Sequence, residues 1–223
     1  MLMRFAAPLA GAFLLASVAA QAIQIPGVRN TGLTAAGTAL SSGDGQIDGN
    51  YKVTATDRAG IVIGANALTY FNPAYLQDGP FSRIVNATGD GTGVVSTTSF
   101  STTFSLAGFD SANATISGQV LFDNSGTIFL NGNQVGGTYT GFGSLSPFGT
   151  NSNFFLSGLN TLTFNLSNAG GPEAFQVAGL TVTAEALPVV PGIPEPATWG
   201  LMIVGFGMVG AATRRRARTS VTA

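Results

Sequence analysis

Two groups of oxygen-bearing side chains in the middle of the chain could bind a ligand. Asp44, Asp48 and Asn50 lie close together in the glycine-rich stretch SSGDGQIDGNY, residues 41–51. Closely spaced carboxylate and amide oxygens on a flexible loop are the ligands that calcium prefers. The stretch lacks the length and the terminal glutamate of an EF-hand loop, so a plain solvated loop and a structural calcium site both remain open.

The second group combines carboxylate, amide and aromatic side chains. Asp123 and Asn124 precede Gly126, and Tyr139 and Phe142 lie in the stretch YTGFGSLSPFG, residues 139–149. The apolar faces of sugars stack on flat rings, and carboxylates and amides bind sugar hydroxyl groups, so these four residues could form a carbohydrate site. The alternatives are an ordinary Asx turn at Asp123–Asn124 and core positions for the aromatic residues.

The chain contains few of the residue types that catalytic sites commonly use. It contains no His and no Cys, and the G-x-S-x-G pattern of a nucleophile elbow is absent. Asp110 and Glu173 could in principle form a pair of catalytic carboxylates, but nothing in the sequence places them together. We therefore expect a protein that is not an enzyme, with a polysaccharide hydrolase as the remote alternative and no cofactor beyond a structural calcium ion.

The charge distribution excludes another class of partner. Residues 23–188 contain four basic and nine acidic side chains, a net charge of about −5, whereas Arg214, Arg215, Arg216 and Arg218 cluster near the C-terminus. Binding of phosphate backbones requires clustered Lys and Arg, so we expect no nucleic acid partner for this part of the chain.

The elements that must position these residues are strands. Apolar residues alternate with Ser and Thr, as at Phe100, Thr102, Phe104 and Leu106, and Asn131–Gly132 has the chemistry of a tight hairpin turn. About eight such strands predict an all-β fold, a single antiparallel β-sandwich over residues 23–188.

The two ends of the chain have the composition of targeting segments. Residues 1–22 combine Arg4, an apolar stretch and the small residues Ala20 and Ala22, which predicts a secretory signal helix cleaved before Ile23. Residues 189–223 begin with a proline-rich linker, and the uncharged run of about 16 residues from Ala197 to Ala212 precedes the arginines. We expect this run to form a short transmembrane helix with the arginines on the cytoplasmic side.

The order of these C-terminal features resembles a known sorting signal. Pro194, Glu195, Pro196 and Ala197 followed by an apolar helix and an arginine cluster resemble the PEP-CTERM signal, in the PEPxA form found in proteobacteria. The resemblance implies export through the Sec translocon, recognition by an exosortase, transient anchoring in the inner membrane, and a final place at the cell surface, at the outer membrane or in the extracellular matrix.

The central domain has a resemblance of its own. The stretches FSLAGFDSANATISGQVLFDNSGTIFLNG and SGLNTLTFNLSNAGGPEAFQVAGLTVTAE are similar to the galactose-binding-like jelly-roll domains that precede many PEP-CTERM signals. The two resemblances together imply a surface protein that binds or organises exopolysaccharide or biofilm matrix. The alternative is a structural matrix protein without a specific ligand.

Overall fold

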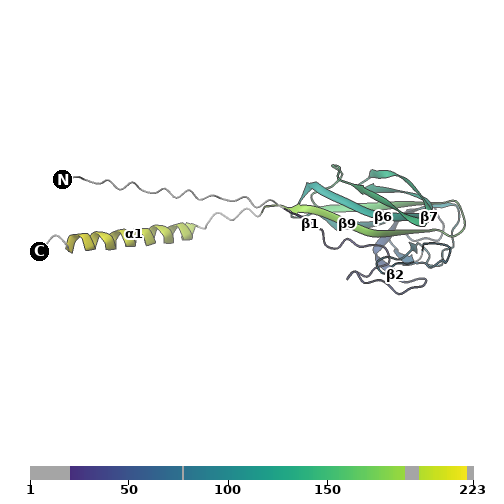
Figure 1. Cartoon of the computed structure of the whole chain (residues 1–223), viewed down its shortest axis with the longest axis horizontal. Helices are drawn as coiled ribbons and strands as arrows, with labels where there is room; N and C mark the ends of the chain where they lie inside the picture. The colour runs from purple at the N-terminus through teal and green to yellow at the C-terminus, as the bar shows by residue number, and fades with distance from the viewer. Residues whose placement is uncertain (1–20, 77, 189–195, 220–223) are drawn as a thin grey trace. The chain divides into compact units, whose positions relative to one another are not determined.

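Nine strands and one helix make up the part of the chain that the computed structural model describes, residues 21–76, 78–188 and 196–219 (Figure 1). The predicted all-β class is therefore confirmed for the region before the helix. The elements are β1 (Ala22–Gln24), β2 (Ile47–Thr56), β3 (Asn66–Thr69), β4 (Val85–Asn86), β5 (Ser96–Ser105), β6 (Phe109–Leu130), β7 (Asn133–Thr150), β8 (Leu159–Asn168), β9 (Ala174–Ala186) and α1 (Pro196–Thr219).

All strand pairs between these elements are antiparallel and belong to one sheet. Its order is β1-β9-β4-β3-β2-β5-β8-β6-β7, and an additional pairing of β6 with β9 closes seven of the strands into a ring. β1 and β7 are added outside the ring, on β9 and β6 respectively. The β-sandwich predicted from strand spacing and the jelly-roll implied by the resemblance are thus corrected to a closed seven-strand barrel with two extra strands, because strand spacing does not show which strands pair.

The ring closes because β6 changes partners at Asp123–Asn124. Before this point β6 pairs with β9, ending at Asp123 opposite Ala174, and after it β6 pairs with β8, beginning at Ser125 opposite Ser167. The last residues of β8 and the first residues of β9 both lie at this point. β6 must therefore turn here to remain antiparallel to both strands. We call this place the β6 corner and define it by Asp123 and Asn124.

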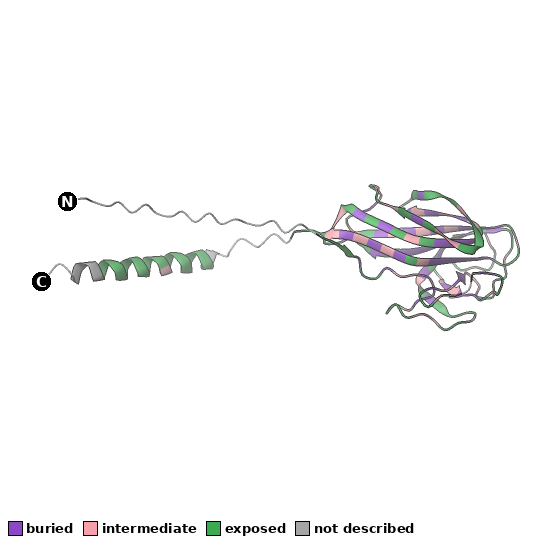
Figure 2. Ribbon diagram, viewed as in Figure 1, coloured by how far each residue is buried: buried purple, intermediate pink, exposed green. Residues whose placement is uncertain are grey.

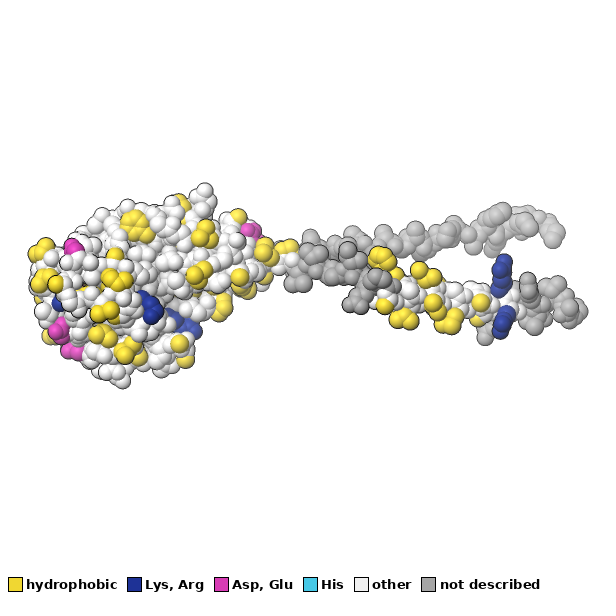
Figure 3. Space-filling view, turned by 180° about the vertical axis from the view of Figure 1, so that it is seen from behind, with side chains coloured by type: hydrophobic (Ala, Val, Ile, Leu, Met, Phe, Trp, Pro, Cys, Tyr) yellow, Lys and Arg dark blue, Asp and Glu magenta, His cyan; other side chains and the backbone are white. Residues whose placement is uncertain are grey.

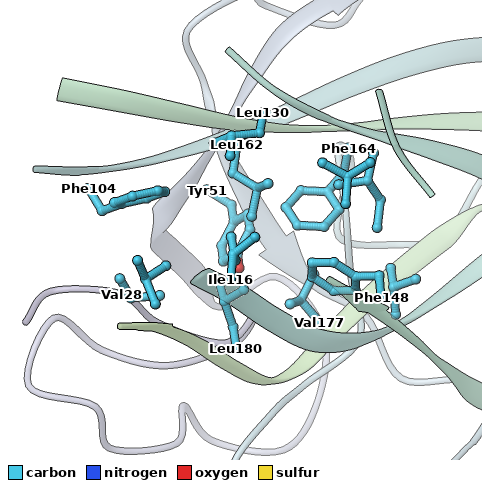
Figure 4. Packing of buried hydrophobic residues seen from close by; sticks show 14 of the residues in the cluster. Val28, Tyr51, Phe104, Ile116, Leu130, Phe148, Leu162, Phe164, Val177 and Leu180 are labelled. Carbon is cyan, nitrogen blue, oxygen red and sulfur yellow. The ribbon is translucent and has the colours of Figure 1, made fainter. Parts of the chain in front are cut away.

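The predicted alternation of buried and exposed side chains is visible along the strands (Figure 2). Inward-facing residues fill the ring, and Phe164 is one of several packed aromatic side chains among them (Figure 4). Its ring centroid is 5.7 Å from that of Phe175 and 6.0 Å from that of Tyr51, and Phe100 and Phe175 are 4.5 Å apart. The Tyr51 hydroxyl donates to the Arg29 carbonyl at 2.8 Å, so its polar end is satisfied inside the core.

The hairpin predicted at Asn131–Gly132 is confirmed. Both residues have positive φ, 51° and 82°, and they connect β6 to β7 with Leu130 opposite Asn133. Two successive residues with positive φ are what a type I′ turn requires, and Asn and Gly tolerate this conformation best.

Both chain ends of the strand domain lie side by side. Ala22 in β1 is opposite Glu185 in β9, and the Leu187 N–H donates to the Gly108 carbonyl at 2.9 Å. The first and last residues of the sheet therefore leave the domain at the same end, the opposite end of β9 from the β6 corner.

The C-terminal apolar run is helical, as expected, but its predicted role as a transmembrane helix needs correction. No helix in the described residues is long and apolar enough to cross a membrane. Four glycines dilute the apolar run, and α1 continues without interruption into the arginines, of which Figure 3 shows only the described side chains in dark blue. The helix is thus longer than expected and less apolar.

Candidate functional site

The β6 corner brings together three of the four residues proposed for carbohydrate binding. β7 bends where β6 does, because Gly141 is the partner of Phe122 whereas β7 resumes pairing with Ser146 opposite Val120. Phe142 therefore lies in an unpaired stretch of β7, directly after the partner of Phe122. The peptide bond between these two residues is cis.

A tyrosine from a distant loop completes this cluster. The Tyr75 hydroxyl donates a short hydrogen bond to Oδ2 of Asp123, and the Tyr75 ring centroid lies 5.1 Å from that of Phe142. The Leu76 N–H also donates to the Phe142 carbonyl at 3.1 Å. Backbone and side-chain contacts thus hold residues 70–76 against the corner, and we call Tyr75, Asp123 and Phe142 the corner cluster.

The loop that carries Tyr75 is braced from within. Asn72 accepts a hydrogen bond from the Ala74 N–H and donates one to the Tyr70 hydroxyl, both at 2.9 Å. Tyr70 in turn packs edge-on against Tyr75, with ring centroids 6.0 Å apart. Tyr75 is not among the four residues proposed from the sequence for carbohydrate binding, although the aromatic density and turn residues of YFNPAYLQDGPF, residues 70–81, offered a signal.

Asp123 and Asn124 have different surroundings within the corner. Asp123 is buried, and burial raises the pKa of its carboxyl while the Tyr75 hydrogen bond opposes that rise. Asn124 is exposed, and its Oδ1 accepts a hydrogen bond from the Ala169 N–H at 2.6 Å. The amide of Asn124 therefore fastens the β8–β9 connection to the corner instead of closing a local Asx turn.

Phe142 and Tyr139 also differ, although only three residues separate them. Phe142 is 38 % exposed and presents part of its ring to solvent. Tyr139 packs against the core with its ring centroid 6.5 Å from that of Phe122, and burial raises the pKa of its hydroxyl. Phe142 is thus the better placed of the two for stacking on a sugar.

A buried ion pair lies near the corner cluster, at the start of β9. Arg58 Nη1 is 2.7 Å from Oε1 of Glu173, the residue before Ala174, which is opposite Asp123. Arg83 pairs with Asp78 at 3.5 Å, and the Arg29 side chain donates to backbone carbonyls. The fourth basic residue of the strand domain, Lys52, lies within β2.

The residues proposed for calcium have other partners. Oδ2 of Asp48 accepts from the Gly32 N–H at 2.7 Å, and Oδ1 accepts from the Asn50 backbone N–H at 2.9 Å and from Asn50 Nδ2 at 3.2 Å. Asp44 Oδ1 accepts from the Phe71 N–H at 2.7 Å. The part of the chain that the structure describes has no group of three His, Cys, Asp or Glu residues that could hold a metal ion. Asp48 is fully buried, so it is not part of a solvated loop.

The acidic pair considered for hydrolysis is separated. Asp110 is opposite Glu185 near the end of β9, whereas Glu173 precedes the first residue of that strand. A strand of this length separates them by roughly 40 Å at 3.3 Å per residue, far beyond the separation of about 5–10 Å in glycoside hydrolases.

The predicted targeting residues are only partly described. Ala22 is the first residue of β1, and Pro196 and Ala197 begin α1, where Arg214 and Arg215 are also located. Ala20, Pro194 and Glu195 lie outside the described residues, as do the side chains of Arg216 and Arg218.

Comparisons with solved structures give weak similarities to this domain. One is a Stig cyclase from Fischerella sp. TAU, with 15 % sequence identity and a TM-score of 0.43, and the match covers 75 % of this chain and 100 % of the cyclase. Another is a family 29 carbohydrate-binding module, with 14 % sequence identity and a TM-score of 0.31, and the match covers 60 % of this chain and 87 % of the module. A third is an arabinose-bound α-L-arabinofuranosidase, with 9 % sequence identity and a TM-score of 0.34, and the match covers 72 % of this chain and 30 % of that enzyme. These TM-scores are too low to assign a shared fold.

A comparison with protein families is specific for the C-terminal region. No curated protein matches the chain, but residues 192–216 match the model of the PEP-CTERM protein-sorting motif. The match spans the predicted Pro-Glu-Pro-Ala motif, the apolar helix and three of the four arginines. The C-terminus of this protein is therefore a PEP-CTERM sorting motif, which marks an exported protein that is processed by an exosortase.

Proposed function

We propose that this protein is a non-catalytic surface or matrix component that binds a neutral extracellular polysaccharide at the corner cluster. The sorting motif supplies the destination, because it directs the chain out of the cell. The observation that supports binding is the partly exposed Phe142 ring packed at a tilt against Tyr75, whose hydroxyl donates a hydrogen bond to Asp123. Aromatic faces beside a hydrogen-bonding carboxylate suit the alternating apolar and hydroxyl-bearing surfaces of a pyranose.

The charges around the cluster favour an uncharged glycan. Asp123 is acidic, Arg58 is engaged by Glu173, and Arg83 is engaged by Asp78. Few charged side chains are visible on the face of the domain in Figure 3. A uronic acid or sulfated polymer would meet net negative charge without a free cation nearby, so we expect it to bind less well than a neutral polymer.

Self-association through strand pairing is less well supported as the main function. β7 is an edge strand of 18 residues and offers the longest edge for pairing with another copy. Its pairing with β6 is irregular at three places, its bend at Phe142 is covered by Leu76, and Pro147 lacks an N–H donor. Bulges and proline are devices by which proteins protect edges against such pairing.

Replacement of Phe142 tests the proposal directly. Phe142→Ala in the mature protein is expected to weaken retention by neutral polysaccharides in affinity gel electrophoresis at least ten-fold, because one stacking partner contributes about 1.5 kcal/mol. Phe81→Ala is the matched control, since Phe81 is 72 % exposed and has no ring contact among the described aromatic pairs. Equal retention of wild type and Phe142→Ala would contradict binding at this place.

A further inference from the structure

One buried amide oxygen near the corner cluster has no hydrogen-bond partner. Gln176 in β9 is only 1 % exposed, and its Nε2 donates to the Ser82 hydroxyl at 2.9 Å. Its Oε1 has no partner among the described residues. Buried acceptors are almost always paired, so an unpaired one calls for a structural or a functional reason.

The register of the sheet places this oxygen on the same face as Asp123. Asp123 is opposite Ala174 and Leu121 is opposite Gln176, and residues two apart in a strand point to the same side. Diagonal neighbours on adjacent strands lie roughly 7 Å apart, a distance that one sugar ring can bridge. Two buried acceptors, a carboxylate and an amide, therefore share one patch of the outer sheet surface.

The patch is buried because the segments 70–76 and 78–84 lie over it. Tyr75 donates to Asp123, and the Ser82 hydroxyl accepts from Gln176. The apolar contacts beneath this cover form a cluster separate from the main core and consist of Tyr70, Tyr75, Ile84 and Ala174. A small satellite cluster over polar groups stabilises the cover less than the main core stabilises the strands, so opening it is among the least costly local rearrangements.

We infer that Gln176 is a further binding residue of the proposed site, with its amide oxygen accepting a hydroxyl hydrogen bond from the glycan once segment 78–84, the part of the cover that contains Ser82, opens while Tyr75 stays in place. The inference rests on the proposed function and deepens it. The floor of the site consists of two acceptors, Asp123 and Gln176, and the rings of Tyr75 and Phe142 form its wall. Neutral sugars supply the hydroxyl donors that both acceptors need, and an anionic group would be repelled by Asp123.

Replacement of Gln176 by an apolar residue separates a binding role from a defect in packing. Gln176→Leu removes the unpaired Oε1 and also the hydrogen bond that Nε2 donates to Ser82. We expect it to weaken retention of the mature protein by galactan, xylan and β-glucan in affinity gel electrophoresis at least ten-fold, for whichever of these the wild type binds. Its thermal midpoint should stay equal or rise. Gln119→Leu is the matched control, because Gln119 lies on the same strand pair two residues from Leu121 and is exposed.

The outcomes are distinct. If Gln176→Leu binds as tightly as the wild type, the oxygen is a packing defect and the inference is wrong, while the proposed function stands. If the wild type binds none of the neutral polymers, both are wrong. Gln176→Met keeps the side-chain length and serves the same purpose if the leucine variant does not fold. Hydrogen exchange of residues 78–84 gives a second readout, since a ligand that opens the cover must change their protection.

Discussion

Arg58 and Glu173 form an ion pair across 115 residues of sequence, with Nη1 of Arg58 2.7 Å from Oε1 of Glu173 and the carboxylate side chain fully buried. The pair joins the loop after β2 to the residue before β9. Burial raises the pKa of Glu173, and Arg58 is the main influence that opposes the rise. The carboxylate therefore depends on one partner for much of its compensation, together with Ser96 at 3.4 Å.

Removal of that partner should destabilise the domain strongly. Arg58→Met leaves a buried carboxylate without its cation, so the free energy of unfolding at pH 7 should fall by about 3 kcal/mol, measured by urea denaturation. The double variant Arg58→Met/Glu173→Gln should recover most of this loss, because no uncompensated charge remains. A single variant as stable as the wild type would show that Glu173 is already protonated at pH 7.

The fully buried Asp48 should make stability fall as pH rises. Burial raises its folded pKa above the ordinary value of 3.8, despite hydrogen bonds from Gly32 and Asn50 that lower it. The folded domain thus binds the proton more tightly than the unfolded chain, and the stability from Asp48 is complete below its ordinary pKa and is lost as pH rises through the raised pKa. Asp48→Asn has no such proton, so unfolding free energies measured between pH 3 and 7 should shift in favour of the variant with increasing pH. A pH-independent difference would contradict the prediction.

Gly91 should tolerate no side chain. Its φ is +67°, and a Cβ atom would lie 2.0 Å from the Tyr70 ring, which packs on Tyr75. Gly91→Ala should lower the free energy of unfolding by about 3 kcal/mol through strain and displacement of the ring, measured by thermal denaturation. Gly108→Ala isolates the backbone effect, because its φ is +85° and its surroundings are open. It should lower the free energy of unfolding by only about 1 kcal/mol.

Processing at the C-terminus should depend on the Pro-Glu-Pro residues. Replacement of Pro194, Glu195 and Pro196 by alanine should abolish recognition by the exosortase, because the matched sorting motif contains all three. Intact mass spectrometry of fractionated cells should then show a chain that still ends at Ala223. The wild type should begin at Ile23 and end near Pro194–Ala197. Identical masses for both proteins would contradict a role for the motif.

Much of the strand pattern could be predicted because it depends on local chemistry. Phe100, Phe104 and Leu106 alternate with small polar residues and are buried, and Asn131 and Gly132 adopt the positive φ that their types favour. Such choices depend on neighbours one or two residues away. The sequence at Asp123–Asn124 is also typical of an ordinary Asx turn, because Asp and Asn occur both in such turns and at the β6 corner.

The closed ring and the corner cluster could not be predicted from the sequence because both depend on distant pairings. Asp123 meets Tyr75 across 48 residues, and β6 meets both β8 and β9. Asp48 was misleading for a related reason, since its glycine-rich neighbourhood suggests solvent exposure while Gly32, 16 residues away, donates to its carboxylate inside the fold. Single-sequence patterns contain no information about such partners.

The neighbouring positions of Ala22 and Glu185 decide which way the domain presents the β6 corner. Eleven residues of β9 separate Glu185 from Ala174 at the corner, roughly 36 Å along an extended strand. A tether at either terminus would therefore hold the same end of the domain, and the corner would face outward in both cases. Trimming of one terminus or the other would change the means of attachment without reversing the orientation of the domain toward its surroundings.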